Sequence, residues 1–527
     1  MRHYAKTPVT SPAGATMARR FGAALVSTFL ATSCAVGPNY HRPDAHVPAQ
    51  FAVQSTPPAT AGSAQASTPV DYATWWHAFH DTELESLIDR AIKANPDIQI
   101  ALDHLQAART FEIVIVGAAL PEAEATAGVG RGTGSDLTRG RAAQNLRSAD
   151  TTTGLQHINV LAGFDTSWEL DIFGKYRREM QAARADYQAT VAQRNAVLVS
   201  VIADVARAYV DLRGLQMRAA VLHRAADVLQ ESARIANERY QRGITNELDV
   251  TLANRELAVL QSQMAPVDSQ ISAAEYTIAT LVGQYPEDLV AELQPAAMVP
   301  PAPAVVQTGL PLELLRRRPD IVQTERELAG ATARIGVATA NLFPSIGITA
   351  AIGYQRQGLG STPVIGKHIW SAGAGAVWPL LDFGSLDAQV EIADLRTRAL
   401  LVSYRRTIQD AVRDVDTSWN SFGAQQQRLG KLGDAMVASQ RAVALATERY
   451  ERGLTDFLNV VDAQRQEYDI EEQYTDAQIG TDEQFIALYR SLGGGWENYQ
   501  DLPPPYFPKP AILAEFRRVL SPGDPLK

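Results

Sequence analysis

The sequence contains one large unit twice, and this duplication limits the possible folds more than any other feature. Pro96-Asp97-Ile98 recurs 223 residues later as Pro319-Asp320-Ile321. Farther along the chain the offset is 210, and residues 238–257 match residues 448–467 at ten of twenty positions. Chance matches would not keep one offset over such distances, so the repeat is a large duplicated unit and not a short-period solenoid. The change of offset places 13 extra residues in one loop of the first copy.

Each copy predicts a helix that ends at a proline, Pro121 or Pro344, and then two strands in which apolar and polar residues alternate. We expect strands over residues 122–131, 158–170, 345–354 and 370–380. Strands of this length can cross a bilayer when tilted. The alternative is a soluble sheet of two hairpins, but its apolar faces are rich in alanine and thin for a core. The apolar faces comprise Ala123, Ala125, Ala127 and Val129; Ile158, Val160, Ala162, Phe164 and Trp168; Ile346, Ile348, Ala350 and Ile352; and Trp370, Ala372, Ala374, Ala376 and Trp378. Trp168, Trp370 and Trp378 suit an interfacial aromatic belt.

Long helices are predicted after each hairpin. A heptad pattern of apolar residues runs from Ile408 to Tyr450, and the first copy keeps its phase from Leu198 to Leu212. A helix from Gly384 to Arg452 would be about 100 Å long. Gly243 and Gly453 interrupt the pattern, and a second helix is expected to return from each. Because four strands cannot close a barrel in lipid, other copies of the chain must complete the sheet.

The N-terminus predicts a secretory signal over residues 1–33. Basic residues including Arg19 and Arg20 precede a short apolar stretch and then Cys34, the single cysteine of the chain. A cysteine at such a cleavage site resembles a bacterial lipobox, although Ala31 stands where leucine is usual. We therefore expect a diacylglycerol and an N-acyl chain on Cys34, which would anchor the protein to a membrane. The alternative is an ordinary signal peptide with a cysteine nearby.

The composition excludes several classes of protein. The net charge is −10, and no long basic run is present, which argues against nucleic acid as a partner. One cysteine excludes an internal disulfide and a multi-cysteine metal site. The nine histidines form no His-Glu-x-x-His motif, and we find no pairing of nucleophile and base. We expect no catalytic site, no metal and no cofactor apart from the lipid on Cys34.

The sequence resembles the TolC-like outer-membrane efflux factors, in particular the lipoprotein branch called NodT-type. The resemblance covers nearly the whole chain from Cys34 to Trp496. Its motifs are residues 34–40 (Cys-Ala-Val-Gly-Pro-Asn-Tyr), Trp75-Trp76 with Leu84, residues 168–174 (Trp-Glu-Leu-Asp-Ile-Phe-Gly), 309–311 (Gly-Leu-Pro), 314–321 (Leu-Leu-Arg-Arg-Arg-Pro-Asp-Ile), 333–338 (Ala-Arg-Ile-Gly-Val-Ala), 343–345 (Phe-Pro-Ser), 462–465 (Asp-Ala-Gln-Arg) and 492–496 (Leu-Gly-Gly-Gly-Trp).

The resemblance implies a mainly α fold with a small β part, built from a duplicated unit of helix, β-hairpin and long helical hairpin. It implies a homotrimer with a twelve-stranded β-barrel in the outer membrane and an α-helical barrel in the periplasm. We expect a lipidated linker over residues 34–70, a first repeat over 71–290, a proline-rich linker over 291–309, a second repeat over 310–496 and a tail over 497–527. The implied partners are a periplasmic adaptor and an inner-membrane transporter of the resistance-nodulation-division class.

Two further sites follow from the resemblance. Leu458, Asp462 and Arg465 match the positions that narrow the periplasmic tip in the family, and their spacing puts them on one helix face. Rings of these side chains would form a gate; the alternative is an ordinary surface pair worth a few tenths of a kcal/mol. Arg242, Gly243, Arg452 and Gly453 match the adaptor contact, although the glycines would also serve as simple turns.

The function implied is a passive exit duct of a tripartite efflux pump, not an enzyme. The protein would lie in the cell outer membrane, anchored at Cys34, and extend into the periplasm. One alternative is the exit duct of a type I protein-secretion system. The lipobox and residues 492–496 argue against it. Another is a periplasmic coiled-coil adaptor, which would lack the four alternating strands.

Overall fold

A computed structural model gives the structure of the chain. It describes residues 35–44, 47–48, 51–52, 71–132, 157–296, 299–303, 316–359, 362–363, 367–500 and 502. The expected signal peptide, Cys34, residues 53–70, the first hairpin loop and residues from 503 onward lie outside the described residues. None of the helices within the described ranges is both long and apolar enough to span a membrane.

The chain divides into two compact units. The first unit comprises residues 1–43, 107–188 and 325–403, and it contains the sheet with the helix ends that join the strands. The second unit comprises residues 44–106, 189–324 and 404–527, and its described secondary structure is helical. Each unit takes segments from both copies of the duplication, so neither copy folds as a separate domain.

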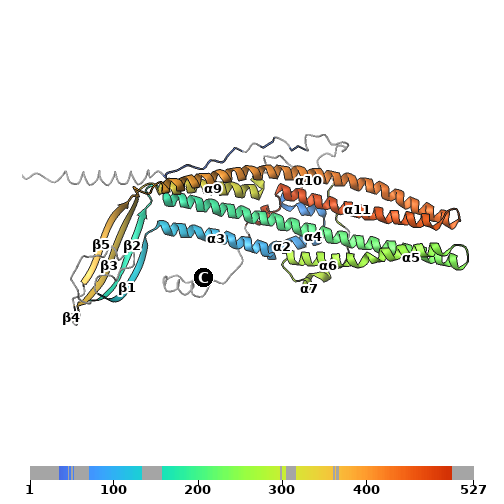
Figure 1. Ribbon diagram of the computed structural model, residues 1–527, viewed down its shortest axis with the longest axis horizontal. Coiled ribbons are helices and arrows are strands. Elements are labelled where there is room, and N and C mark those ends of the chain that lie inside the picture. Colours follow the sequence, from blue (N-terminus) through green and yellow to red (C-terminus); the bar gives the residue numbers. More distant parts are fainter. Residues whose placement is uncertain are drawn as a thin grey trace, which may run out of the picture. The chain divides into compact units, whose positions relative to one another are not determined.

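The duplication is visible in the helices (Figure 1). Helices α3 (Pro96–Ala119) and α9 (Pro319–Ala340) both begin at a proline, which suits the first turn because its missing N–H is not needed there. Helices α4 (Lys175–Gln241) and α10 (Ser385–Glu451) each have 67 residues, and both of their ends keep the offset of 210. The long helices predicted from the heptad pattern are confirmed.

The returning helices differ between the copies. In the second copy α11 runs unbroken over Phe457–Leu492, whereas in the first copy the chain is divided at Gln263. Pro266, in the first turn of α6, has no N–H to donate to the preceding turn, which accounts for the break. The remaining helical elements are η2 (Tyr72–Phe79), α2 (Thr82–Ala94), α5 (Glu247–Ser262), α6 (Met264–Leu281), α7 (Pro286–Leu293) and η4 (Glu497–Tyr499).

The four long strands form one antiparallel sheet in the order β1-β2-β3-β5, and the short β4 pairs with the far end of β3. The junction between the two copies is the β2–β3 pair. Among the described strands, β1 and β5 are the edges, and each pairs on one side alone. The bounds are β1 (Glu122–Gly132), β2 (His157–Leu170), β3 (Ser345–Leu359), β4 (Thr362–Pro363) and β5 (Lys367–Val377).

Two predicted strand boundaries in the second copy are wrong. Strand β3 continues five residues beyond 354, because its last residues pair with the start of β2, where His157 lies opposite Leu359. Strand β5 covers 367–377 instead of 370–380, since it follows β3 and ends opposite Ser345, the first residue of β3. Trp378 therefore lies just past the strand.

The two faces of the sheet differ as the alternation predicted. Register places Phe164 opposite Ile352 and Ile352 opposite Trp370, so one face carries a row of apolar side chains that are 66%, 64% and 78% exposed. The other face carries Asp165, which accepts a hydrogen bond of 3.2 Å from the Thr126 hydroxyl. No second layer covers the apolar face within the described residues of the first unit.

The main hydrophobic core lies in the second unit. It buries the heptad positions of α4 from Leu198 to Leu212 and, on α10, the positions Ile408, Val415 and Phe422. Trp75 and Trp76 are 1% and 2% exposed, and the Trp75 ring stacks on Tyr489 with 5.7 Å between the centroids. A Cβ on Gly494 would lie 2.5 Å from the Tyr72 carbonyl oxygen. The glycines after α11 are thus required for the chain to pass close to η2.

Candidate functional site

Two tryptophans tie the strands to the helices in the same way in both copies. The Trp168 indole donates a hydrogen bond of 3.1 Å to the Ala119 carbonyl at the end of α3. The Trp378 indole donates an equal bond to the Leu342 carbonyl just after α9. The donors are 210 residues apart and the acceptors 223, as the duplication requires. An indole with its N–H satisfied and its ring exposed suits an interface between lipid and water.

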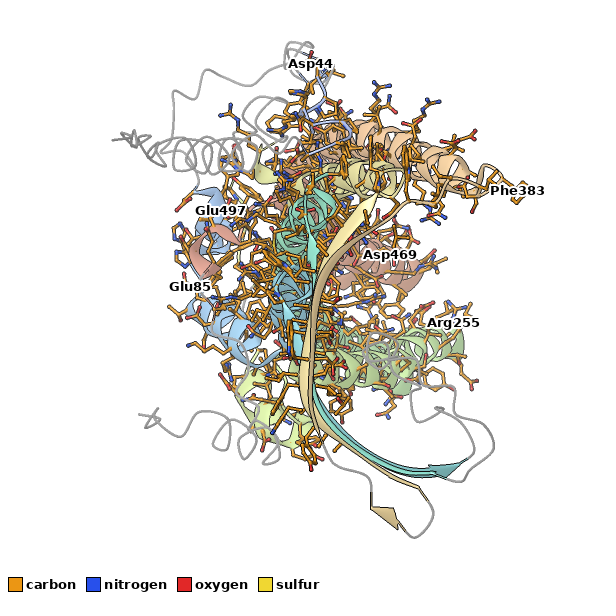
Figure 2. All side chains as sticks on the ribbon, turned by 90° about the vertical axis from the view of Figure 1, so that its left-hand side faces the viewer. Asp44, Glu85, Arg255, Phe383, Asp469 and Glu497 are labelled. Atoms are coloured by element: carbon orange, nitrogen blue, oxygen red, sulfur yellow. The ribbon has the colours of Figure 1, made fainter. Side chains whose placement is uncertain are left out.

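An aromatic contact joins the two copies within the first unit. Phe173 stacks on Phe343 with the ring centroids 4.7 Å apart. Phe383 is the counterpart of Phe173 at offset 210, yet its side chain is 97% exposed, and Figure 2 shows it projecting from the molecule. Leu120, the counterpart of Phe343 at offset 223, is also exposed. Each copy therefore contributes one residue to the stacked pair, Phe173 or Phe343, and one exposed counterpart, Leu120 or Phe383.

The segment after Cys34 is held against the first unit by a buried arginine. The Arg178 guanidinium, in a residue 3% exposed, donates hydrogen bonds of 3.0 Å to the carbonyls of Val36 and Gly37 and to the Asn39 side chain. The Val36 N–H donates to the Phe173 carbonyl. A Cβ on Gly37 would lie 2.5 Å from the Gly336 Cα. Residues 35–39 are thus part of the folded unit.

The two helical hairpins turn at glycines, as predicted. Gly243 and Gly453 have φ of 70° and 73°, the left-handed conformation that terminates helices. In each turn the glycine N–H donates to a tyrosine carbonyl three residues back, and the next N–H donates to an arginine carbonyl. Arg242 and Arg452 are exposed beside these glycines, and Arg452 pairs with Glu448 on its own helix.

A small apolar cluster joins the two turns within the second unit. It contains Tyr450 and Phe457 together with Ala233, Ala236, Ala253, Val460 and Val461. Phe457 is 1% exposed and fixes the first turn of α11. The predicted gate residues follow it on an exposed part of that helix.

The gate residues Leu458, Asp462 and Arg465 lie on α11 and are exposed. The nearest carboxylate to Arg465 within the described chain is Asp469, with 3.9 Å between Nε and Oδ2, and not Asp462. In the first copy Leu248 and Arg255 occupy the matching positions on α5, and Arg255 pairs with Glu256. The acidic member is thus carried by α11 alone.

Sequence reasoning missed three residues. The first is Arg178. A buried guanidinium needs hydrogen-bond acceptors, but the burial of Arg178 is visible only in the fold, so no sequence pattern indicated its role. Asp482 is 1% exposed and accepts a hydrogen bond of 2.7 Å from the Ala302 N–H, and burial raises its pKa to about 7. The third, Glu467, is half-buried between the hairpins, and burial followed by the charge of Glu471 raises its pKa.

Comparison with known proteins gives the family. The family model described as "Outer membrane efflux protein" matches residues 87–284 and 310–494, which is well over half of the chain. The division of the match follows the two copies of the duplicated unit.

Relatives and solved structures agree with this match. Nodulation protein T of Rhizobium leguminosarum is 28% identical over 439 residues, which cover 83% of this chain and 89% of that protein. The pyoverdine export outer membrane protein OpmQ of Pseudomonas aeruginosa is 28% identical and covers 83% of this chain and 90% of its own length. The outer-membrane channel OprN is 32% identical with a TM-score of 0.75, and the alignment covers 88% of this chain and 100% of that one.

The predicted fold class and the predicted efflux role are confirmed by these comparisons. The family is described as outer membrane efflux proteins, OpmQ as an export protein of the outer membrane and OprN as an outer-membrane channel. The chain belongs to the outer membrane efflux protein family and is an outer-membrane efflux channel.

Proposed function

We propose that this protein is the exit duct of a tripartite efflux pump and that three copies close one tube through the outer membrane. The observation that carries the proposal is the sheet of the first unit, whose edges β1 and β5 each lack a partner on one side among the described strands. Unpaired backbone groups at a sheet edge cost several kcal/mol each in lipid, so the edges must pair with other copies.

The number of copies follows from the requirement that the lumen of the barrel hold water. Two copies would give eight strands, whose interior side chains fill the barrel, whereas three give twelve and leave room for water. The face that carries Thr126 and Asp165 is polar and suits a wet interior. The opposite face, with Phe164, Ile352 and Trp370, suits contact with lipid.

The duplication predicts how neighbouring copies meet. Within one chain Thr166 of β2 lies opposite Ala350 of β3. Adding 210 to the first number gives Ala376 of β5, and subtracting 223 from the second gives Ala127 of β1. If the seam between copies repeats the junction within a chain, Ala376 of one copy lies opposite Ala127 of the next. The same rule places Phe383 against Leu120 of the neighbour, where Phe173 and Phe343 stack within one chain.

A lipid anchor at Cys34 fits the first unit. Ala35 lies against Gly174, because a Cβ on that glycine would be 2.6 Å from the Ala35 Cα. Gly174 follows the end of β2 by four residues. Acyl chains on Cys34 would therefore start beside the strand ends, at the level where the aromatic residues suit the membrane interface.

The gate is proposed at the tips of the hairpins. Asp462 makes no hydrogen bond or ion pair with any other described residue of its own chain, so its charge is available to a neighbouring copy. Bonds between Asp462 and Arg465 of adjacent copies would hold the tip shut, and acidic rings favour cations. The exposed Arg242, Gly243, Arg452 and Gly453, with Ile244 and Leu454 beside them, offer a mixed apolar and basic surface for a periplasmic adaptor. The pump is proposed to be of the resistance-nodulation-division class.

Planar-bilayer recording of the purified protein tests the duct and the gate together. We expect a trimer in detergent that inserts and conducts, with rare openings in the wild type. Replacing Asp462 and Arg465 by alanine should raise the opening frequency. A stable monomer without conductance would reject the duct, and a conducting trimer whose double variant opens no more often would reject the gate alone.

A further inference from the structure

A groove lies between the two helical hairpins of one chain, within the second unit. Its walls come from α4, α5 and α11, with Gln440 of α10, and its volume is about 640 Å³, within the range of small-molecule sites. Leu229 and Leu260 form an apolar floor, and Val228 and Val259 stand half-exposed at its lip. In Figure 2 the labelled Arg255 and Asp469, both lining residues, lie on the same side of the helices. We call this cavity the hairpin groove.

Polar contacts hold the groove at a fixed width. The Tyr468 hydroxyl donates a hydrogen bond of 2.9 Å to the Gln263 side chain, which joins α11 to the break between α5 and α6. Toward the tip, Ser232 of α4 and Gln464 of α11 share hydrogen bonds of 3.2 and 2.9 Å. The hairpins are therefore connected on both sides of the cavity, and the groove is present without a ligand.

The charges that line the groove do not balance. Three arginines and four carboxylates line it, and three ion pairs join Arg224 to Glu471, Arg255 to Glu256 and Arg465 to Asp469. Glu467 is the carboxylate left over. It makes no hydrogen bond or ion pair with any described residue, although it is half-buried. Burial and the charge of Glu471 raise its pKa, which means that its charge lacks compensation.

The first copy shows that the fold does not need this carboxylate. At offset 210 the counterpart of Glu467 is Leu257, which packs against the apolar cluster beside the groove. The same helical position in the same hairpin design is thus occupied by leucine without loss of structure. An uncompensated acid at such a position costs stability, and a bound cation would remove that cost.

We propose that the hairpin groove binds an organic cation with an apolar body, whose positive group lies beside Glu467 and whose body covers Val228, Val259 and Leu260. Charge complementarity selects the cation, because Glu467 is the unmatched charge of the lining. The apolar floor selects an organic ion over a metal ion, since one carboxylate supplies too few oxygen ligands. The site would lie beside Arg465, so an occupant would contact the helix that carries the proposed gate, but binding itself does not depend on the export function.

The test uses ethidium, a planar aromatic cation, and phenanthridine, its uncharged parent ring system. Both compounds are titrated into the full-length protein in lipid nanodiscs, and the concentration of free ligand is measured by equilibrium dialysis. Empty nanodiscs serve as the control for binding to lipid. We expect saturable ethidium binding that Glu467→Gln weakens about threefold to tenfold, as for a half-exposed charge pair. Phenanthridine binding should not change in this variant. Ethidium binding should also weaken as the pH falls toward the raised pKa of Glu467.

Three variants separate the site from other effects. Asp476→Asn removes the same charge from an exposed position of α11 outside the groove, so it should leave ethidium binding unchanged. Glu467→Leu copies the first repeat, should fold normally and should weaken ethidium more than Glu467→Gln. Val228→Trp fills the groove from its exposed lip and should abolish binding of both compounds. Equal losses in Glu467→Gln and Asp476→Asn, or unchanged binding in Val228→Trp, would overturn the proposal.

Discussion

The seam between copies gives the sharpest prediction, because the duplication fixes its register to one residue. We predict that the double variant Ala127→Cys, Ala376→Cys forms disulfides between neighbouring copies. Side chains directly opposite each other in an antiparallel pair have Cβ atoms about 4.5–5.5 Å apart, whereas diagonal neighbours lie about 7–8 Å apart. A disulfide needs a Cβ separation of about 3.5–4.5 Å, so small adjustments allow the first pair and exclude the second.

The assay is oxidation of the membrane-embedded protein followed by electrophoresis without reductant. The predicted result is a ladder of dimer and covalently closed trimer that collapses to monomer on reduction. Thr166→Cys with Ala350→Cys is the matched control, because these residues are the counterparts within one chain and should form a disulfide without a change of mass. Ala125→Cys with Ala376→Cys is displaced by two residues and should cross-link poorly.

Two outcomes would refute the seam. If Ala125 cross-links to Ala376 better than Ala127 does, the register between copies differs from the register within a chain. If no pair cross-links although the control pair inside the chain does, the edges β1 and β5 do not meet at all. A one-residue slip would move Ala127 to the other face of the sheet and would likewise prevent the disulfide.

Two further predictions follow from the buried charges. Arg178→Ala removes three charge-assisted hydrogen bonds to residues 36–39, so hydrogen exchange of the Val36 amide should accelerate by about 100-fold or more; Arg178→Lys, which lacks the planar fork, should rescue it poorly, and unchanged exchange would show that the segment is held by other contacts. Because burial raises the pKa of Asp482 from 3.8 to about 7, its contribution to stability is complete below pH 4 and is lost as the pH rises past 7. Asp482→Asn keeps an acceptor for the Ala302 N–H, so the free energy of unfolding of the variant should rise relative to that of the wild type by about 2–3 kcal/mol between pH 5 and pH 8, as measured by thermal unfolding followed by circular dichroism; parallel pH profiles would contradict this assignment.

Much of the fold could be read from periodicity. The heptad pattern predicted α4 and α10, and the alternation of period two predicted which face of each strand is apolar. Strand ends were less predictable, because the ends of β3 and β5 are set by the strands opposite them and not by their own residues. The predicted gate residues and turn glycines lie where expected on the hairpins, and their roles stay predictions.

The sequence by itself determined the duplicated plan: a local period specifies a helix or a strand, and two fixed offsets specify which elements are equivalent. Tertiary structure alone decided which of two equivalent residues makes packing contacts. Phe173 stacks on Phe343, whereas its counterpart Phe383 is exposed. Leu257 packs against an apolar cluster, whereas its counterpart Glu467 lines a groove. The physical reason is that contact and burial depend on neighbours brought from distant parts of the chain, which no local pattern records.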